Sequence, residues 1–245
     1  MSFIRALFLG VTLLSFSQGK EAFHIKGPYD IDADGQVEAL VLNSRDFSAM
    51  LVEILPSGDD TLWTYSLSND LTINDCEIVD LNGDGMEEII LIPNLITVFE
   101  NQPWLYVFLG SSAGFRDQPL TYQDAPFDLE IIRPLNLTRL SGITQKVGVC
   151  FGSPIRQGMI FNIIISNDLL VLKNIKMVST PTTSNGYGVL QMEGFTSGGN
   201  EFITIVSAEK KTLKTTILSM DKDFEIIHSE TITIDNASNI LTTGI

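Results

Sequence analysis

Short hydrophobic runs alternate with polar, turn-forming residues along most of this chain. The runs are rich in Val, Ile and Leu, and Gly, Asp, Asn, Pro and Ser separate them. They read EALVL, MLVEIL, EIILI, WLYVFLG, KVGVC, MIFNIII, EFITIV and TTILSM. After residue 19, no window combines an apolar period of about 3.6 residues with helix-capping residues. The pattern predicts an all-β protein of many short strands, arranged as a sandwich, a barrel or a propeller.

An internal repeat of fifty residues stands out in the first half of the chain. Residues 30–40, DIDADGQVEAL, align without a gap on residues 80–90, DLNGDGMEEII. Each acidic segment precedes an apolar run, and a second apolar run ending in a turn follows. We call residues 30–38 the first loop and residues 80–88 the second loop. Such a repeat indicates that one supersecondary unit recurs along the chain.

Two later units retain the apolar runs but lose the acids. With them, the strand-rich region divides into four units at about 22–72, 73–124, 125–183 and 184–245. In the third unit we expect Asn136 and Gly142 in a loop before a strand. In the fourth unit we expect a similar loop with Glu193, Ser197, Gly199 and Glu201.

The N-terminus has the pattern of a secretory signal peptide. Arg5 precedes the apolar run 6–16, and Ser17-Gln18-Gly19 supplies small residues for cleavage. This run is shorter than the roughly 20 residues that span a bilayer, although an uncleaved anchor is the alternative. We predict a signal peptide over 1–19, a single domain over 20–245, and a secreted, periplasmic or cell-surface location without a membrane span after cleavage.

The chain is strongly acidic, and this charge limits the classes of molecule that it can bind. It carries 30 acidic and 15 basic side chains, for a net charge of −15. Loss of residues 1–19 would remove Arg5 and no acid, which makes the net charge −16. Such a chain repels nucleic acid and anionic lipid headgroups, so we expect neither as a partner. The charge suits cation binding, and it also keeps an exported protein soluble.

The spacing of oxygen-bearing residues in both loops suits Ca²⁺. This cation prefers six to eight oxygen ligands at roughly 2.3–2.6 Å, and positions 1, 3, 5, 7 and 9 of a loop can supply them, position 7 through its backbone carbonyl. Gly35 and Gly85 occupy the sixth position, where the chain turns sharply. The predicted ligands are Asp30, Asp32, Asp34, Gln36 and Glu38 in the first loop, and Asp80, Asn82, Asp84, Met86 and Glu88 in the second.

Two other interpretations of these loops fit the sequence less well. An EF-hand requires a Glu at position 12 and flanking helices, whereas Val41 and Leu91 stand there within strand-like runs. A hairpin turn rich in Asp, Asn and Gly would need no metal. Two copies in register, on an acidic and exported chain, favour the metal site between two strands.

The two loops resemble the calcium loops of FG-GAP/VCBS repeats, the integrin-α-type unit. DIDADGQVEALVL and DLNGDGMEEIILI carry the resemblance, and WLYVFLGSSAGF resembles the strand and turn that follow. It implies a β-propeller with one four-stranded antiparallel blade per unit and structural Ca²⁺ bound between the first two strands. The third and fourth units depart from the pattern, because Asn136, Thr138, Ser197 and Gly199 replace acids.

The chain length limits the number of blades. There is room for about four or five blades, and propellers have about four to eight. We therefore expect a small propeller or a partial one, completed by a partner or by self-association.

These features together predict an exported, calcium-binding, non-enzymatic module that binds or adheres to a protein or a glycan. One alternative is a secreted hydrolase of the glycosidase or esterase kind, since GSSAG at 110–114 offers Ser112 in a G-x-S-x-G pattern. No helical pattern follows Ser112, and of the two histidines only His228 lies downstream. Another alternative is a structural subunit of a surface complex.

Remaining polar and aromatic residues add smaller expectations. Cys76 and Cys150 could form a disulfide in an exported protein, or they remain as buried thiols. Trp63 and Trp104 lie in strand-like runs, which favours packing between strands over stacking on sugars. Asn136 and Asn236 begin glycosylation sequons that matter only in a eukaryotic secretory pathway.

Overall fold

The computed structural model describes most of the strand-rich part of the chain. The described residues are 23–32, 34–43, 48–67, 72–93, 103–124, 134–139, 146–151, 157–178, 186–197, 200–209, 212–220 and 226–234. Over these residues the chain forms sixteen strands in four sheets. Every sheet has four antiparallel strands that follow one another in chain order. The predicted all-β class is confirmed.

The four sheets follow the chain in sequence. The first contains β1 (Phe23–Tyr29), β2 (Val37–Asn43), β3 (Ser48–Ile54) and β4 (Asp60–Ser66). The second contains β5 (Ile73–Val79), β6 (Glu88–Pro93), β7 (Leu105–Phe108) and β8 (Leu120–Tyr122). The third contains β9 (Pro134–Arg139), β10 (Lys146–Phe151), β11 (Gln157–Ser166) and β12 (Leu169–Val178). The fourth contains β13 (Gly186–Ser197), β14 (Asn200–Glu209), β15 (Thr212–Met220) and β16 (Ile226–Ile234).

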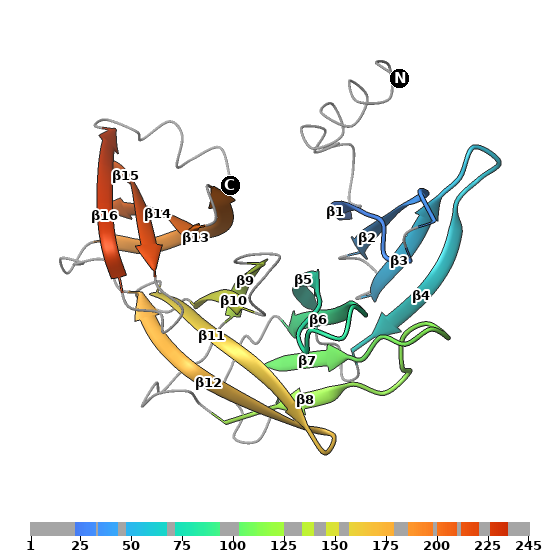
Figure 1. Ribbon diagram of the computed structural model, residues 1–245. Coiled ribbons are helices and arrows are strands. Elements are labelled where there is room, and N and C mark those ends of the chain that lie inside the picture. Colours follow the sequence, from blue (N-terminus) through green and yellow to red (C-terminus); the bar gives the residue numbers. More distant parts are fainter. Residues whose placement is uncertain are drawn as a thin grey trace.

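Each later sheet packs its first strand against the sheet that precedes it. Strand β5 contacts β2 and β3, β9 contacts β5 and β6, and β13 contacts β9, β10 and β11. Figure 1 shows the sheets in chain order along an arc, with the first and fourth sheets at its two ends. Consecutive four-stranded meanders packed in this way are the blades of a propeller. The architecture is therefore a small or partial β-propeller, as predicted.

An aromatic cluster fills the space between the first and second sheets. Phe108 is fully buried, and its ring centroid lies 4.9 Å from that of Trp63 and 4.6 Å from that of Tyr65. Leu40 and Ile89 are also fully buried in this cluster. Trp63 thus packs in the core, as its strand-like context predicts, and it anchors β4 to the neighbouring sheet.

A second cluster joins the second and third sheets. The ring centroid of Trp104 lies 6.1 Å from that of Phe161 on β11, and both side chains are buried. The indole Nε1 of Trp104 donates a hydrogen bond to the backbone oxygen of Asp124 at 3.0 Å. Ile90 and Leu172 complete the contact from opposite sides. Trp104 therefore also packs in the core, with its polar edge satisfied.

The expected loops of the third and fourth units are wrong. Asn136 lies within β9 opposite Cys150, and Glu193 lies within β13 opposite Thr204. Both segments continue the antiparallel ladder, so they are strand rather than loop. In β9 the sequence PLNLTR alternates apolar and polar residues, which is the period of a strand.

The hairpin of β13 and β14 also contradicts the loop expected in the fourth unit. Ser197 pairs with Asn200, and Thr196 pairs with Glu201, so both predicted loop residues belong to the ladder. Gly142 and Gly199 lie outside the described residues, as do Asn236 and the predicted signal peptide 1–19. Among the residues described, the structure has no helix of the length and apolarity needed to cross a membrane.

Cys76 is a buried free thiol on β5. Its burial raises its pKa well above the ordinary range, so the side chain stays a neutral, poorly reactive thiol. The predicted alternative of a disulfide between Cys76 and Cys150 is therefore excluded in this structure.

Candidate metal centre

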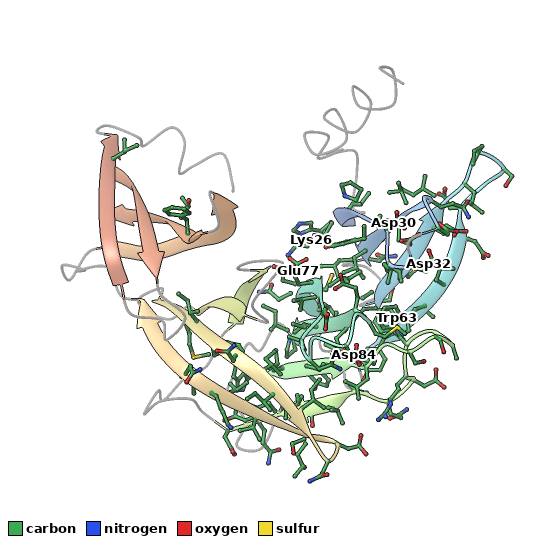
Figure 2. All side chains as sticks on the ribbon, viewed as in Figure 1. Lys26, Asp30, Asp32, Trp63, Glu77 and Asp84 are labelled. Atoms are coloured by element: carbon green, nitrogen blue, oxygen red, sulfur yellow. The ribbon has the colours of Figure 1, made fainter. Side chains whose placement is uncertain are left out.

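Both acidic loops connect the first two strands of a sheet. The first loop joins β1 to β2, and Tyr29 pairs with Glu38 at its base. The second loop joins β5 to β6, and Val79 pairs with Glu88 at its base. Figure 2 shows Asp30 and Asp32 beside β2 and Asp84 beside the second sheet. Each loop thus has the strand–loop–strand setting that the sequence predicts.

A glycine with positive φ makes the sharp turn in each loop. The φ angles are 84° at Gly35 and 85° at Gly85. An L-residue with a side chain rarely adopts this conformation, so glycine at the sixth position has a steric reason in both copies.

In the first loop, three aspartates turn toward one another. The Oδ1 atoms of Asp30, Asp32 and Asp34 accept hydrogen bonds from the backbone N–H groups of Gly35, Asp34 and Gln36, at 3.4, 3.2 and 2.7 Å. One carboxylate oxygen from each aspartate lies within 4.8 Å of the others. The three side chains are exposed, so their charges converge at the loop surface. Gln36 lies beside them, because its Nε2 donates to Oδ2 of Asp34 at 2.8 Å.

Glu38 forms the floor of the first loop. It is 1% exposed, and its Oε2 accepts a hydrogen bond from the backbone N–H of Ile31 at 2.8 Å. Its buried Oε1 has no hydrogen-bond partner. Burial raises the pKa of Glu38, and the charges of the three loop aspartates raise it further, against the effect of the Ile31 bond. The carboxylate therefore lacks a compensating positive charge.

A further carboxylate, Glu53 on β3, faces this floor. One carboxylate oxygen each from Asp34, Glu38 and Glu53 lie within 4.8 Å of one another. The run MLVEIL predicted a strand here but no ligand. The structure supplies what the sequence lacked, because the strand register pairs Glu53 directly with Glu38 across β2 and β3. Like charges placed opposite each other destabilise a sheet unless something compensates them.

The backbone hydrogen bonds of the second loop resemble those of the first, but the side chains at its middle differ. Asp80 accepts hydrogen bonds from the backbone N–H groups of Gly83 and Gly85 at 2.7 and 3.1 Å. Oδ1 of Asn82 accepts from the N–H of Asp84 at 2.8 Å, and Oδ1 of Asp84 accepts from the N–H of Met86 at 2.8 Å. Met86 itself is 40% exposed, and its predicted contribution is a carbonyl rather than its side chain.

The amide of Asn82 holds the second loop together. Its Nδ2 donates to Oδ2 of Asp84 at 2.9 Å and to Oε1 of Glu88 at 3.4 Å. Glu88 is 1% exposed, and its Oε2 accepts from the N–H of Leu81 at 2.7 Å. Asn82, which aligns with Asp32 of the first loop, thus donates hydrogen bonds to the carboxylates of Asp84 and Glu88.

Burial raises the pKa of Glu88 to about 7, with the negative charges of Asp84, Asp80 and Glu87 adding to the effect. The Leu81 hydrogen bond acts in the opposite direction. At neutral pH a proton and a cation therefore compete for the Glu88 carboxylate.

The first loop brings three carboxylate oxygens together as a hard cation requires, whereas the acids of the second loop form no such group among the described residues. All predicted ligands of both loops bind through oxygens of carboxylates, an amide or the backbone, and neither loop contains a cysteine or a histidine. Such donor sets suit Ca²⁺ or Mg²⁺ rather than zinc or copper. The first loop collects more negative charge than the second, because it has Asp32 and Glu53, whereas the second has Asn82 and adds only Glu87.

Ser112, the predicted hydrolase candidate, lies in a tight turn between β7 and β8. The backbone N–H groups of Ser111 and Gly114 each donate to the other residue's carbonyl oxygen at 3.0 Å. The side chain of Ser112 is exposed, and strand β8 follows rather than a helix. A nucleophile elbow requires a strand-to-helix turn, so Ser112 does not have that setting.

Comparisons with known proteins find resemblance in structure alone. No protein-family model matches the sequence, and no curated protein matches it. The β-propeller domain of Nup133 from Vanderwaltozyma polyspora is similar at a TM-score of 0.47 and 10% identity. That comparison covers 87% of this chain and 64% of the Nup133 domain, so this chain spans less than two thirds of it.

A protein of unknown function from Desulfotomaculum acetoxidans is similar at a TM-score of 0.43 and 11% identity. The matched region covers 82% of this chain and 68% of the other.

Proposed function

We propose that this protein is an exported β-propeller module that binds Ca²⁺ in its first and second loops. The observation that carries the proposal is the floor of the first loop. Glu38 is buried there with one carboxylate oxygen unpaired, beneath three aspartates whose oxygens converge within 4.8 Å. A divalent cation among these oxygens would compensate their charge and supply the missing partner of Glu38.

The role of the cation is structural. Each loop ends at the first residues of the strand that packs against a neighbouring sheet, so order in the loop extends to the blade. A ligand that binds only the folded state stabilises it by about 2.7 kcal/mol when its concentration is a hundred times Kd. For a domain of this size the corresponding rise in melting temperature is roughly 5–10 °C.

The resulting module binds a protein or a glycan without catalysing a reaction. Propellers present loops on a rigid frame, and the described residues around Ser112 lack the strand-to-helix setting of a nucleophile elbow. The resemblance of the loops to FG-GAP/VCBS repeats supports adhesion as the class of function. The apolar run at 6–16 supports export, because it has the length and flanks of a signal peptide.

Thermal unfolding with and without calcium tests the metal sites. We expect the melting temperature of the full chain to rise on addition of Ca²⁺ and to fall on addition of a chelator. Asp34→Asn and Asp84→Asn should each reduce the rise, because each removes a charge from one loop. Asp117→Asn is the matched control, since Asp117 is an exposed acid outside both loops. A wild-type melting temperature that is insensitive to Ca²⁺ and chelator would contradict the proposal.

Binding to a partner needs a separate experiment. The purified chain should bind an immobilised panel of glycans or extracellular proteins, and the binding should weaken after removal of Ca²⁺. Turnover of an ester or a glycoside that is lost in Ser112→Ala would instead favour the hydrolase alternative.

A further inference from the structure

We infer that Glu53 of β3 is an additional ligand of the cation in the first loop, so that the two loops form unequal sites. The inference rests on the proposed calcium binding and goes beyond it. The nine-residue loop pattern contains no position for this residue, because Glu53 comes from the next strand of the sheet.

The geometry of β2 and β3 places Glu53 at the site. Glu53 lies directly opposite Glu38 in the ladder, between the pairs Val37–Ile54 and Ala39–Val52. Carboxylate oxygens of Asp34, Glu38 and Glu53 lie within 4.8 Å of one another. Two ligands on opposite sides of a calcium ion are about 5 Å apart, so this set can surround one ion.

An unpaired buried atom points to the same place. Glu38 is 1% exposed, and its Oε1 has no hydrogen-bond partner, whereas its Oε2 bonds to Ile31. Glu38 thus contributes a buried carboxylate with one unsatisfied oxygen to the group that it forms with Asp34 and Glu53. Burying such an atom is costly unless a cation or a donor reaches it.

Lys26 and Arg116, two basic side chains of the described residues, are engaged elsewhere. Lys26 pairs with Asp75 and Glu77, and Arg116 pairs with Asp168. On β4, the residue that faces Glu53 is Asp60, which adds negative charge rather than compensating it. A bound cation is thus the compensation that fits this cluster.

The second loop has an apolar residue at the corresponding position. Ile89 pairs with Phe108 where Ala39 pairs with Val52, and the residue that follows Phe108 in the chain is the apolar Leu109. Leu109 packs against the core between the second and third sheets. With Asn82 in place of Asp32 as well, the second loop has fewer carboxylates. Because the charge of the ligand set tunes calcium affinity, the first loop should bind Ca²⁺ more tightly than the second.

Calorimetric titration of the full chain with Ca²⁺ tests this inference. The wild type should show two sites of different affinity. Glu53→Gln should weaken only the tighter site, by about tenfold or more. Asp60→Asn is the matched control, because it removes a charge next to Glu53 without removing a ligand. Its effect should be no more than about threefold, as expected for a solvent-exposed charge.

Combining Glu53→Gln with a variant of either loop shows which calcium site Glu53 serves. In Asp84→Asn, the remaining site should still weaken when Glu53→Gln is added. In Asp34→Asn, adding Glu53→Gln should change nothing, because the first site is already disabled. Thermal unfolding in chelator would show whether each variant is folded, and Glu53→Asp serves as a second variant that keeps the charge but withdraws the carboxylate.

The outcomes separate this inference from the proposed function. Two wild-type sites together with equal effects of Glu53→Gln and Asp60→Asn would overturn the role of Glu53 and leave calcium binding intact. Absence of calcium binding in the wild type would overturn both.

Discussion

Nζ of Lys26 on β1 lies 2.9 Å from Oδ1 of Asp75 on β5, and this ion pair joins the first and second sheets. Oε2 of Glu77 lies 3.5 Å from the same Nζ, and the hydroxyl of Tyr29 donates to Oε1 of Glu77 at 2.8 Å. Figure 2 shows Lys26 and Glu77 side by side. Burial alone would lower the pKa of Lys26, but the two carboxylates raise it well above its ordinary value. Lys26 therefore stays charged throughout the physiological range.

This ion pair also links the two candidate metal loops. Strand β1 runs directly into the first loop and β5 into the second, so the Lys26 cluster lies at the base of both hairpins. The side chains of Lys26 and Asp75 are only 19% and 4% exposed, which makes their interaction less screened than a surface pair.

Removing one partner of this pair should be costly. Lys26→Met leaves Asp75 and Glu77 buried without their cation, and we expect a loss of about 3–5 kcal/mol in the free energy of unfolding. Lys26→Met combined with Asp75→Leu should recover part of this loss, because fewer buried charges remain. Urea unfolding of the two variants and the wild type measures both values. A single variant as stable as the wild type would contradict the structural role of the pair.

Stability of the metal-free protein should depend on pH through Glu88. Its pKa is about 7 in the folded protein and near 4.5 when unfolded, so the folded state binds the proton more tightly. The stabilisation is complete below about pH 4.5 and is lost as the pH rises through 7. In chelator, this group makes unfolding easier at pH 7.5 than at pH 5.

Calcium should remove much of that dependence, because the cation replaces the proton as the compensation for Glu88. Thermal unfolding at several pH values, with chelator and with Ca²⁺, measures the effect. Glu88→Gln is the control, since its amide does not titrate. An identical pH profile for this variant and the wild type in chelator would show that Glu88 is not responsible.

The aromatic cluster between the first two sheets should contribute much of the free energy that holds these sheets together. Phe108→Ala removes a fully buried ring that contacts Trp63 and Tyr65, and we expect a loss of about 3–5 kcal/mol. Leu62→Ala is the control on β4, because Leu62 is 50% exposed and should change stability by less than about 0.5 kcal/mol. Chemical unfolding followed by tryptophan fluorescence compares them. Similar losses in both variants would argue against a localised core.

The turn after β7 should require a glycine at position 110. A Cβ atom at Gly110 would lie 2.1 Å from the backbone oxygen of Glu87, which precedes Glu88 in the second loop. Gly110→Ala should therefore displace that backbone, destabilise the fold by about 1–3 kcal/mol and weaken calcium binding at the second loop. Ser112→Ala in the exposed part of the same turn is the control. Calcium titration and thermal unfolding of both variants provide the comparison, and equal behaviour would contradict the steric argument.

Export should leave a defined N-terminus. Cleavage after Gly19 yields a mature chain that begins at Lys20, and replacement of Gly19 by Arg should block cleavage because a small residue is required there. N-terminal sequencing of the exported protein measures the cleavage site. Recovery of the intact N-terminus would favour the uncleaved anchor.

Much of the candidate site could be predicted from local sequence. Asp30, Asp32 and Asp34 recur as Asp80, Asn82 and Asp84, and the glycine at the sixth position has positive φ in both loops. These features depend on backbone preferences within a few residues, so their spacing shows in the sequence. The failure at Asn136 has the same origin, since a polar residue in an alternating strand was interpreted as part of a loop.

What the sequence alone determined is the β class, the fifty-residue repeat and the two acidic loops, because alternation and Asp/Gly spacing act over neighbouring residues. Only the tertiary structure decided that Glu53 faces Glu38 and that Lys26 reaches Asp75 in the next sheet. Strand register and sheet packing set those contacts between residues distant in sequence. The energy of each contact depends on burial that no local pattern encodes.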